Sequence, residues 1–104
     1  MAVYKNEGRW GKSNVAFDGQ KVTQYDKKNP TPAMHHIDFG LSALRASVIE
    51  HETIAGAPCD LADIFERLSQ KKDLAGLEIR TRFYEIGSPE GLKDFETYLS
   101  LTAS

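Results

Sequence analysis

Runs of alternating apolar and polar residues are interleaved in this chain with runs whose apolar residues recur every three or four positions. The clearest alternation covers residues 37–44, where the apolar positions are Ile37, Phe39, Leu41 and Ala43. The clearest helical spacing follows Asp60, with an apolar face made of Leu61, Ile64, Phe65 and Leu68. Side chains repeat about every 2 residues in a strand and about every 3.6 in an α-helix, so the two patterns predict different elements. Their succession favours a sheet covered by helices.

Residues typical of turns and helix caps predict further elements before residue 37 and after residue 68. Asp18-Gly19 separates β-prone runs at 14–17 and 21–25, and an Asp-Gly pair suits the positive φ angles of a tight hairpin turn. Residues 77–83 alternate again. Ser88-Pro89-Glu90 then combines a capping hydroxyl, a proline and an acid, which is typical of a helix start. A short helix or turn is also predicted at 46–51.

The resulting order is hairpin, strand, helix, strand, helix. It predicts an α/β or α+β domain with a mixed sheet of about four to five strands and two main helices. The length of 104 residues suits one domain spanning residues 1–104. The last helix presents an apolar face formed by Leu92, Phe95 and Leu99.

Charge and composition exclude several classes of partner. The formal net charge is −2 with both signs interspersed, so the chain lacks the basic stripe of nucleic-acid-binding proteins. It has no apolar run near the ~20 residues of a membrane helix, and its first residues lack the apolar segment of a secretory signal. The single cysteine, Cys59, cannot form an internal disulfide. We therefore expect a cytoplasmic protein with no nucleic-acid or membrane partner.

Lysines and an aspartate near predicted strand ends are candidate binding groups. Lys27 and Lys28 follow a predicted strand and precede the rigid segment 29–32, which contains two prolines, so both ammonium groups can face a phosphate. The alternative is a solvated loop. Asp38 and Gly40 share the polar side of a strand, where Asp is disfavoured. Asp38 is therefore either an edge-strand charge or a ligand contact.

Glu85 and Gly87 stand between a predicted strand and a predicted helix. Ligands of open α/β sheets collect at the carboxyl ends of strands, and a glycine lets a ligand approach the backbone. The alternative is a surface acid beside a turn. The adjacent His35 and His36 point to opposite faces of a strand and cannot share one metal.

The chain lacks a loop that would cradle nucleotide phosphates. Its eight glycines are scattered, and the segment 8–11 is too short for a Gly-rich phosphate loop. No serine stands in a nucleophile elbow. We expect no complete phosphate-activating site.

Several short motifs are weak singly but specific in their order. They are residues 6–15, 17–19, 25–28, 37–41, 60–63 and 83–92. The series resembles the C-terminal half of sugar-1-phosphate nucleotidyltransferases, and most of all the branch that includes heptose-1-phosphate guanylyltransferases. The resemblance extends from about Val3 to about Tyr98.

This resemblance implies half of a Rossmann-like nucleotidyltransferase domain. In the complete enzyme, a sugar-1-phosphate oxygen attacks the α-phosphate of a nucleoside triphosphate and expels pyrophosphate, while Mg²⁺ and cationic side chains neutralise charge. The Gly-rich loop, a lysine and a Mg²⁺-binding aspartate belong to the N-terminal half, which has no counterpart in these 104 residues. We therefore expect no activity from this chain alone. We expect a homodimer, or a separately encoded nucleotide-binding half.

The resemblance also implies roles for two lysines. The segment Tyr25-Asp26-Lys27-Lys28 is the counterpart of the family's Glu-Lys-Pro motif, whose lysine holds the sugar phosphate. The position of Tyr25 favours Lys28 as that lysine, and Lys27 is the alternative. A sugar 1-phosphate is the expected ligand.

Two further segments of the resemblance imply contacts with sugar and metal. Asp38-Phe39-Gly40 takes the place of an Asn-Ala-Gly strand that contacts the sugar. The segment from Glu85 to Pro89 matches an Asp-Ile-Gly-Thr-Pro pattern whose aspartate is a metal ligand. The longer side chain of Glu85 leaves a sugar or water-mediated contact as the alternative to direct Mg²⁺ coordination.

The expected site consists of few residues. Lys28 and Glu85 are the catalytic candidates, with Glu85 also the candidate metal ligand. The substrate-binding candidates are Lys27, Lys28, Asp38, Gly40 and Gly87. The hypothesis requires Lys28, Asp38 and Glu85 to meet at one crevice. A stand-alone, non-catalytic sugar-phosphate-binding or oligomerisation module is the alternative function.

Overall fold

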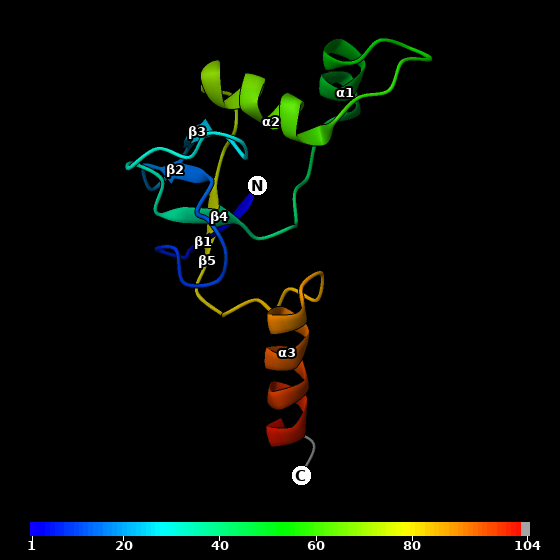
Figure 1. The fold of residues 1–104 in the computed structure, drawn as a ribbon. Coiled ribbons are helices and arrows are strands. Elements are labelled where there is room, and N and C mark those ends of the chain that lie inside the picture. Colours follow the sequence, from blue (N-terminus) through cyan, green and yellow to red (C-terminus); the bar gives the residue numbers. More distant parts are fainter. Residues whose placement is uncertain (103–104) are drawn as a thin grey trace.

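The computed structural model describes residues 1–102, which form a five-stranded mixed sheet with three helices (Figure 1). The strands are β1 (Ala2–Lys5), β2 (Val15–Phe17), β3 (Val22–Tyr25), β4 (His36–Asp38) and β5 (Leu77–Ile79). The helices are α1 (Ala46–Glu52), α2 (Leu61–Gln70) and α3 (Pro89–Thr102). The strand order is β3-β2-β4-β1-β5, in which β1 and β5 run parallel and the other neighbours antiparallel. The predicted α/β class with a mixed sheet is confirmed.

The predicted hairpin joins β2 and β3 through Asp18 and Gly19. The carboxylate of Asp18 accepts hydrogen bonds from the amides of Gln20 (2.9 Å) and Lys21 (2.7 Å). Gly19 has a φ of 101°, a conformation that side chains with a Cβ rarely adopt. The Asp-Gly turn that the sequence predicts therefore forms and joins β2 to β3.

The two alternating segments form shorter strands than predicted. β4 ends at Asp38 because the chain turns at Gly40, where φ is 90°, and the Asp38 carboxylate accepts a hydrogen bond from the Gly40 amide (2.8 Å). Leu41, predicted to lie in the core, is 68% exposed. β5 likewise ends at Ile79, and the chain from 80 to 88 has no regular structure. The predictions of strands over 37–44 and 77–83 were wrong in their extent.

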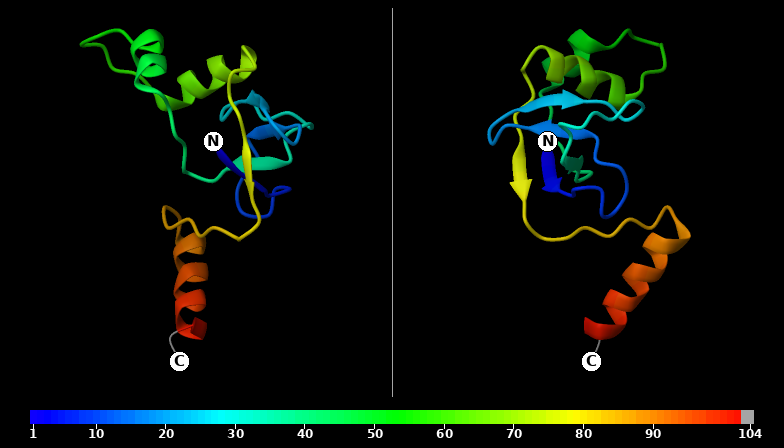
Figure 2. Two further views of the ribbon diagram at one scale, coloured as in Figure 1. Left: turned by 180° about the vertical axis from the view of Figure 1, so that it is seen from behind. Right: turned by 60° about the vertical axis from the view of Figure 1, so that its left-hand side comes forward.

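The core lies between the sheet and α2. Asp60 begins this helix as predicted, and its carboxylate accepts a hydrogen bond from the Ala62 amide (2.9 Å). The buried cluster joins the apolar face of α2 to four sheet residues and Leu74: Val3, Val15, Val22, Tyr25, Ile64, Phe65, Leu68 and Leu74. Figure 2 shows α2 lying across one side of the sheet.

α1 is held to α2 by one carboxylate. The Glu52 side chain is only 6% exposed and accepts hydrogen bonds from Lys71 Nζ (2.7 Å) and Arg67 Nε (2.8 Å). None of the described α1 residues is buried. The position of α1 therefore depends on charge-assisted hydrogen bonds together with the partly buried Val48, which packs against the core.

We expect α1 to stay attached to α2 in acid until close to pH 2. Hydrogen bonds from Lys71 and then Arg67 lower the pKa of Glu52 to about 2, from 4.5. A lowered folded-state pKa means that this stabilisation is fully present above pH 4.5 and is lost as the pH falls through about 2. Amide chemical shifts of α1 followed by NMR from pH 6 to pH 2 measure this loss. In Glu52→Gln the α1 shifts should be displaced already at pH 6, and unchanged shifts would contradict the proposed attachment.

α3 stands apart from the rest of the chain. It begins at Pro89 as predicted, but none of its described residues is buried (Figures 1 and 2). The radius of gyration is 15.3 Å, whereas compact domains of about 100 residues have values of about 13 Å. None of the helices in residues 1–102 is long and apolar enough to cross a membrane. The chain thus leaves much of its helical surface without an internal partner.

Candidate functional site

The two candidate lysines lie on a fixed loop at the edge of a small cleft. Asp26 fixes the loop, because its carboxylate accepts hydrogen bonds from the amides of Lys28 (2.9 Å) and Asn29 (3.0 Å). The cleft has a volume of about 170 Å³ and lies between this loop and the first turns of α2. Both Lys27 and Lys28 line it. The rigid loop predicted from the sequence is therefore present, with Asp26 as its organising residue.

The charges around this cleft are mixed. Two ammonium groups face four carboxylates, which belong to Asp26, Asp60, Asp63 and Glu66. The carboxylates outnumber the lysines and repel a phosphate, so a phosphate would have to lie against the two lysines and away from α2. The cleft therefore suits a ligand that carries hydroxyl groups besides an anion, because hydroxyl groups donate hydrogen bonds to carboxylates.

Tyr25 forms the floor of the cleft. It is buried, and its ring meets Phe65 edge-on at 5.6 Å. Burial, followed by the charges of Asp38 and Asp60, raises the pKa of Tyr25 to about 12. The phenol therefore stays protonated at neutral pH and can donate a hydrogen bond. Asp60 lines the lysine cleft with Tyr25, whereas Asp38 is not among the residues that line it.

Asp38 and Gly40 form a turn at the end of β4. Besides the bond from its carboxylate to the Gly40 amide, Asp38 donates its own amide to Asn14 Oδ1 (3.1 Å). Apart from Gly40 and its two chain neighbours, no described residue has an atom within 4 Å of the position that a Cβ on Gly40 would take. Glycine is needed there for its positive φ angle, and the open space beside it is free for a ligand.

Glu85 lines a different cleft, which has a volume of about 390 Å³. One wall of this cleft is the loop of Arg9, Trp10 and Gly11, and the other is the start of α3. The Glu85 carboxylate accepts hydrogen bonds from the Gly87 amide and from Ser88 Oγ (3.0 Å). Its carboxylate oxygens are thus engaged within the turn that begins α3.

The two glycines of this turn allow close contacts inside the chain. A Cβ on Gly87 would collide with the Glu85 carboxylate, and a Cβ on Gly91 would collide with the Glu85 backbone carbonyl. Ser88 Oγ also accepts a hydrogen bond from the Gly91 amide (3.1 Å), which makes Ser88 the helix cap that the sequence predicts. Gly87 therefore serves the turn, and its contact with a ligand stays a prediction.

The residues present do not by themselves form a Mg²⁺ site. Within residues 1–102 no three His, Cys, Asp or Glu side chains are grouped so that they could hold a metal ion. Mg²⁺ prefers several oxygen ligands in near-octahedral geometry, and Glu85 offers one carboxylate already bonded to its own turn. The other Mg²⁺ ligands would be waters, phosphate oxygens of a substrate or groups of another polypeptide segment.

A stacked arginine in the larger cleft was not predicted from the sequence. The guanidinium of Arg82 lies 4.3 Å from the ring centroids of both Trp10 and Tyr84. Its Nη2 donates a hydrogen bond to Asp94 Oδ2 on α3 (3.1 Å). No sequence pattern relates Trp10 to Arg82 and Tyr84, which lie far along the chain from it. The only sequence signal for this cluster is that Trp10 is the single tryptophan of the chain.

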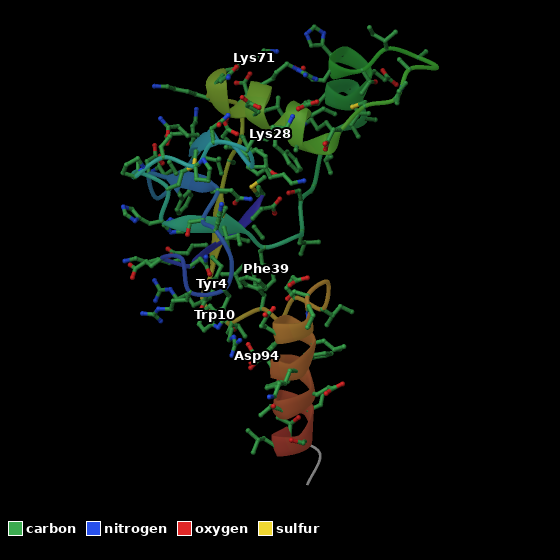
Figure 3. All side chains as sticks on the ribbon, in the orientation of Figure 1. Tyr4, Trp10, Lys28, Phe39, Lys71 and Asp94 are labelled. Carbon is green, nitrogen blue, oxygen red and sulfur yellow. The ribbon has the colours of Figure 1, made fainter. Side chains whose placement is uncertain are left out.

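The structure brings some of the candidate residues together and separates others. Lys27 and Lys28 line one cleft with Tyr25, Glu85 lines the cleft beside α3, and Asp38 lines neither of these two clefts. In Figure 3, Lys28 lies near α2, while Trp10 and Asp94 mark the second cleft near the start of α3. The expected meeting of Lys28, Asp38 and Glu85 at one crevice is therefore not seen in this chain alone. No protein-family model, curated protein or solved structure matches the chain.

Proposed function

We propose that this chain is the sugar-phosphate-binding half of a cytoplasmic sugar-1-phosphate nucleotidyltransferase and is inactive without a nucleotide-binding half. The observation that carries the proposal is the lysine cleft, where Lys27 and Lys28 lie on a loop organised by Asp26, beside a Tyr25 phenol that is protonated at neutral pH. The motif order from about Val3 to about Tyr98 supports the same function.

Each group around the lysine cleft has a role in this proposal. The ammonium groups of Lys28 and Lys27 hold the phosphate as point charges. The Tyr25 hydroxyl and the Asp38 carboxylate, one a donor and the other an acceptor, bind sugar hydroxyl groups. Catalysis of nucleotidyl transfer then rests on positioning and charge neutralisation rather than on covalent chemistry with the protein.

In this chain without a second half, we propose only a structural role for Glu85. Its carboxylate holds the turn before α3, so we assign it no catalytic step here. In the complete enzyme Mg²⁺ supplies charge neutralisation at the reacting phosphates.

The apolar surface of the chain supports a partner. The exposed large apolar residues come from the loops around α1 and β4, from β5 and from α3, and include Leu41, Ile54, Leu77, Ile86, Leu92 and Leu101. On α3 alone Leu92, Tyr98, Leu99 and Leu101 are exposed, and an apolar helix face without a partner marks an interaction surface. These residues support docking of a nucleotide-binding half, with a second copy of this chain as the alternative partner.

We expect the variant Lys28→Ala to bind glucose 1-phosphate or mannose 1-phosphate at least about 10-fold more weakly than the original chain. Loss of a charge-assisted hydrogen bond costs about 1.5–3 kcal/mol, and about 1.4 kcal/mol corresponds to tenfold in affinity. Isothermal titration calorimetry measures the two dissociation constants. Lys93→Ala is the matched control, because Lys93 is an exposed lysine on α3 outside both clefts.

Three results would contradict the proposal. Equal binding by the original chain, Lys27→Ala and Lys28→Ala would remove the lysine cleft as the site. Inorganic phosphate binding as tightly as the sugar phosphates would leave only an anion site. Pyrophosphate release from a nucleoside triphosphate, Mg²⁺ and a sugar 1-phosphate by this chain alone would show that no second half is needed.

A further inference from the structure

Asn14 is bonded both to the lysine loop (residues 26–29) and to the end of β4. It directly precedes β2, the strand that lies between β3 and β4 in the sheet. Its backbone carbonyl accepts a hydrogen bond from the Asp26 amide (3.1 Å). Its own amide donates a hydrogen bond to the His36 carbonyl (3.0 Å), and its side-chain Oδ1 accepts one from the Asp38 amide (3.1 Å). One residue therefore joins the lysine loop to the candidate sugar-binding turn.

The Asn14 side chain extends a short strand pairing. Within residues 1–102, β2 and β4 share one register pair, Val15 with His36, so backbone pairing between these strands ends before Asp38. Because a backbone N–H can only donate, the Asn14 atom that faces the Asp38 amide is the acceptor Oδ1. Asparagine side chains offer such bonds to a nearby backbone where the strand ladder does not supply them. The place of Asp38 beside β2 therefore depends on a side-chain hydrogen bond.

This bond matters for ligand binding because Asp38 does not itself line the lysine cleft. Its carboxylate belongs to the turn at Gly40, beside open space. After burial, the Asp38 charge is the next cause that raises the pKa of Tyr25, a residue that does line the cleft. A sugar phosphate that contacts both Lys28 and Asp38 needs a fixed separation between the two groups, because a small displacement of one binding group breaks simultaneous contact.

We propose that Asn14 is a positioning residue that fixes Asp38 relative to the lysine loop, and that it thereby makes the site select sugar phosphates over inorganic phosphate. The inference rests on the proposed function, because it assigns Asn14 to the same site. The lysines hold the phosphate group, and the Asp38 carboxylate accepts a hydrogen bond from a sugar hydroxyl where Asn14 holds it in reach. Inorganic phosphate has no sugar that could reach Asp38, so its binding does not depend on Asn14.

Calorimetric titration of Asn14→Ala with two ligands tests this role. The variant keeps both backbone hydrogen bonds of residue 14 and loses only the side-chain bond to Asp38. We expect the tighter-binding of glucose 1-phosphate and mannose 1-phosphate to bind about 3- to 10-fold more weakly, the effect of one hydrogen bond, and the affinity for inorganic phosphate to stay unchanged. In an Asp38→Ala background, Asn14→Ala should have no further effect, because the group that Asn14 positions is absent.

Thr23→Ala is the matched control. Thr23 Oγ1 donates a hydrogen bond to the Ala16 carbonyl (3.2 Å), so this variant also removes one side-chain bond between neighbouring strands, but Thr23 does not line the lysine cleft. Both affinities should be unchanged in it. The positioning role would be overturned by full sugar-phosphate affinity in Asn14→Ala, by an equal loss for inorganic phosphate, or by a loss that persists in the Asp38→Ala background, because the last two would report a general effect on the sheet.

Amide hydrogen exchange followed by NMR separates failure of this inference from failure of the proposed function. In Asn14→Ala the Asp38 amide loses the acceptor that Asn14 supplies and should exchange faster, whereas the Lys28 amide, bonded to the Asp26 carboxylate, should exchange as before. If the original chain binds sugar phosphates but Asp38 exchange is unchanged in the variant, this inference alone fails. If the original chain binds no sugar phosphate, the proposed function fails and the selective role of Asn14 fails with it.

Discussion

Replacing Phe65 by alanine lowers the free energy of unfolding by about 3–5 kcal/mol, the range for removing a buried phenylalanine. Phe65 is 3% exposed and lies in the centre of the α2 face that covers the sheet. Its ring meets the edge of Tyr25 at 5.6 Å, so the variant loses an aromatic pair and leaves a cavity. Urea unfolding followed by circular dichroism measures the change.

The effect is large relative to the stability of the whole chain. A domain of this length has a total free energy of unfolding of about 5–15 kcal/mol, and this chain has one small core beneath a single helix. Leu61→Ala is the control on the same helix, because Leu61 is half exposed and should cost less than about 1 kcal/mol. Phe65→Leu should fall between the two variants. A loss below about 1 kcal/mol in Phe65→Ala would show that the core is not centred on α2.

Local chemistry made some elements predictable. The Asp18-Gly19 turn, the Asp60 cap and the Ser88 cap each form from residues within a few positions of one another, and each appears in the structure. Backbone conformation limited the prediction of strand ends. The alternation of residues 37–44 continues past Gly40 in sequence, but the positive φ angle of Gly40 ends the regular strand, although the Leu41 carbonyl still accepts a hydrogen bond from the Ala2 amide (2.9 Å).

Long-range contacts limited the prediction of the site. The lysine loop could be inferred because its prolines and Asp26 are close to the lysines in the sequence. The carboxylates that face the lysines across the cleft could not be inferred, because they belong to the start of α2, far along the chain. Glu85 lies apart from Lys28 because it belongs to the turn that begins α3, and α3 is joined to the segment 80–88 by contacts such as Tyr84 stacked on Tyr98, which no sequence pattern predicts. Arg82 between Trp10 and Tyr84 could not be foreseen, because no sequence pattern relates Arg82 to Trp10.

Replacing Asn6 by alanine should lower the free energy of unfolding by about 2–4 kcal/mol and release the Trp10 loop. Asn6 is fully buried, and its side-chain amide donates hydrogen bonds to the Gly11 carbonyl (2.9 Å) and Ser13 Oγ (3.3 Å). Its Oδ1 accepts a hydrogen bond from the Trp10 amide (3.1 Å). Alanine leaves these groups without a partner, and each buried unpaired group costs about 1–3 kcal/mol. Urea unfolding measures the stability, and Trp10 fluorescence measures the release.

Two comparisons separate this effect from a general effect of removing an asparagine. Asn29→Ala makes the same chemical change at an exposed loop position and should alter stability by less than about 0.5 kcal/mol. Asn6→Asp keeps the oxygen that faces the Trp10 amide but replaces the donor that faces the Gly11 carbonyl. It should therefore also destabilise the chain, since two acceptors then face each other in a buried site. If Asn6→Ala is as stable as the original chain and its Trp10 emission is unchanged, the loop of residues 9–11 is held by other contacts. Asn6 would then not be the residue that holds this wall of the larger cleft in place.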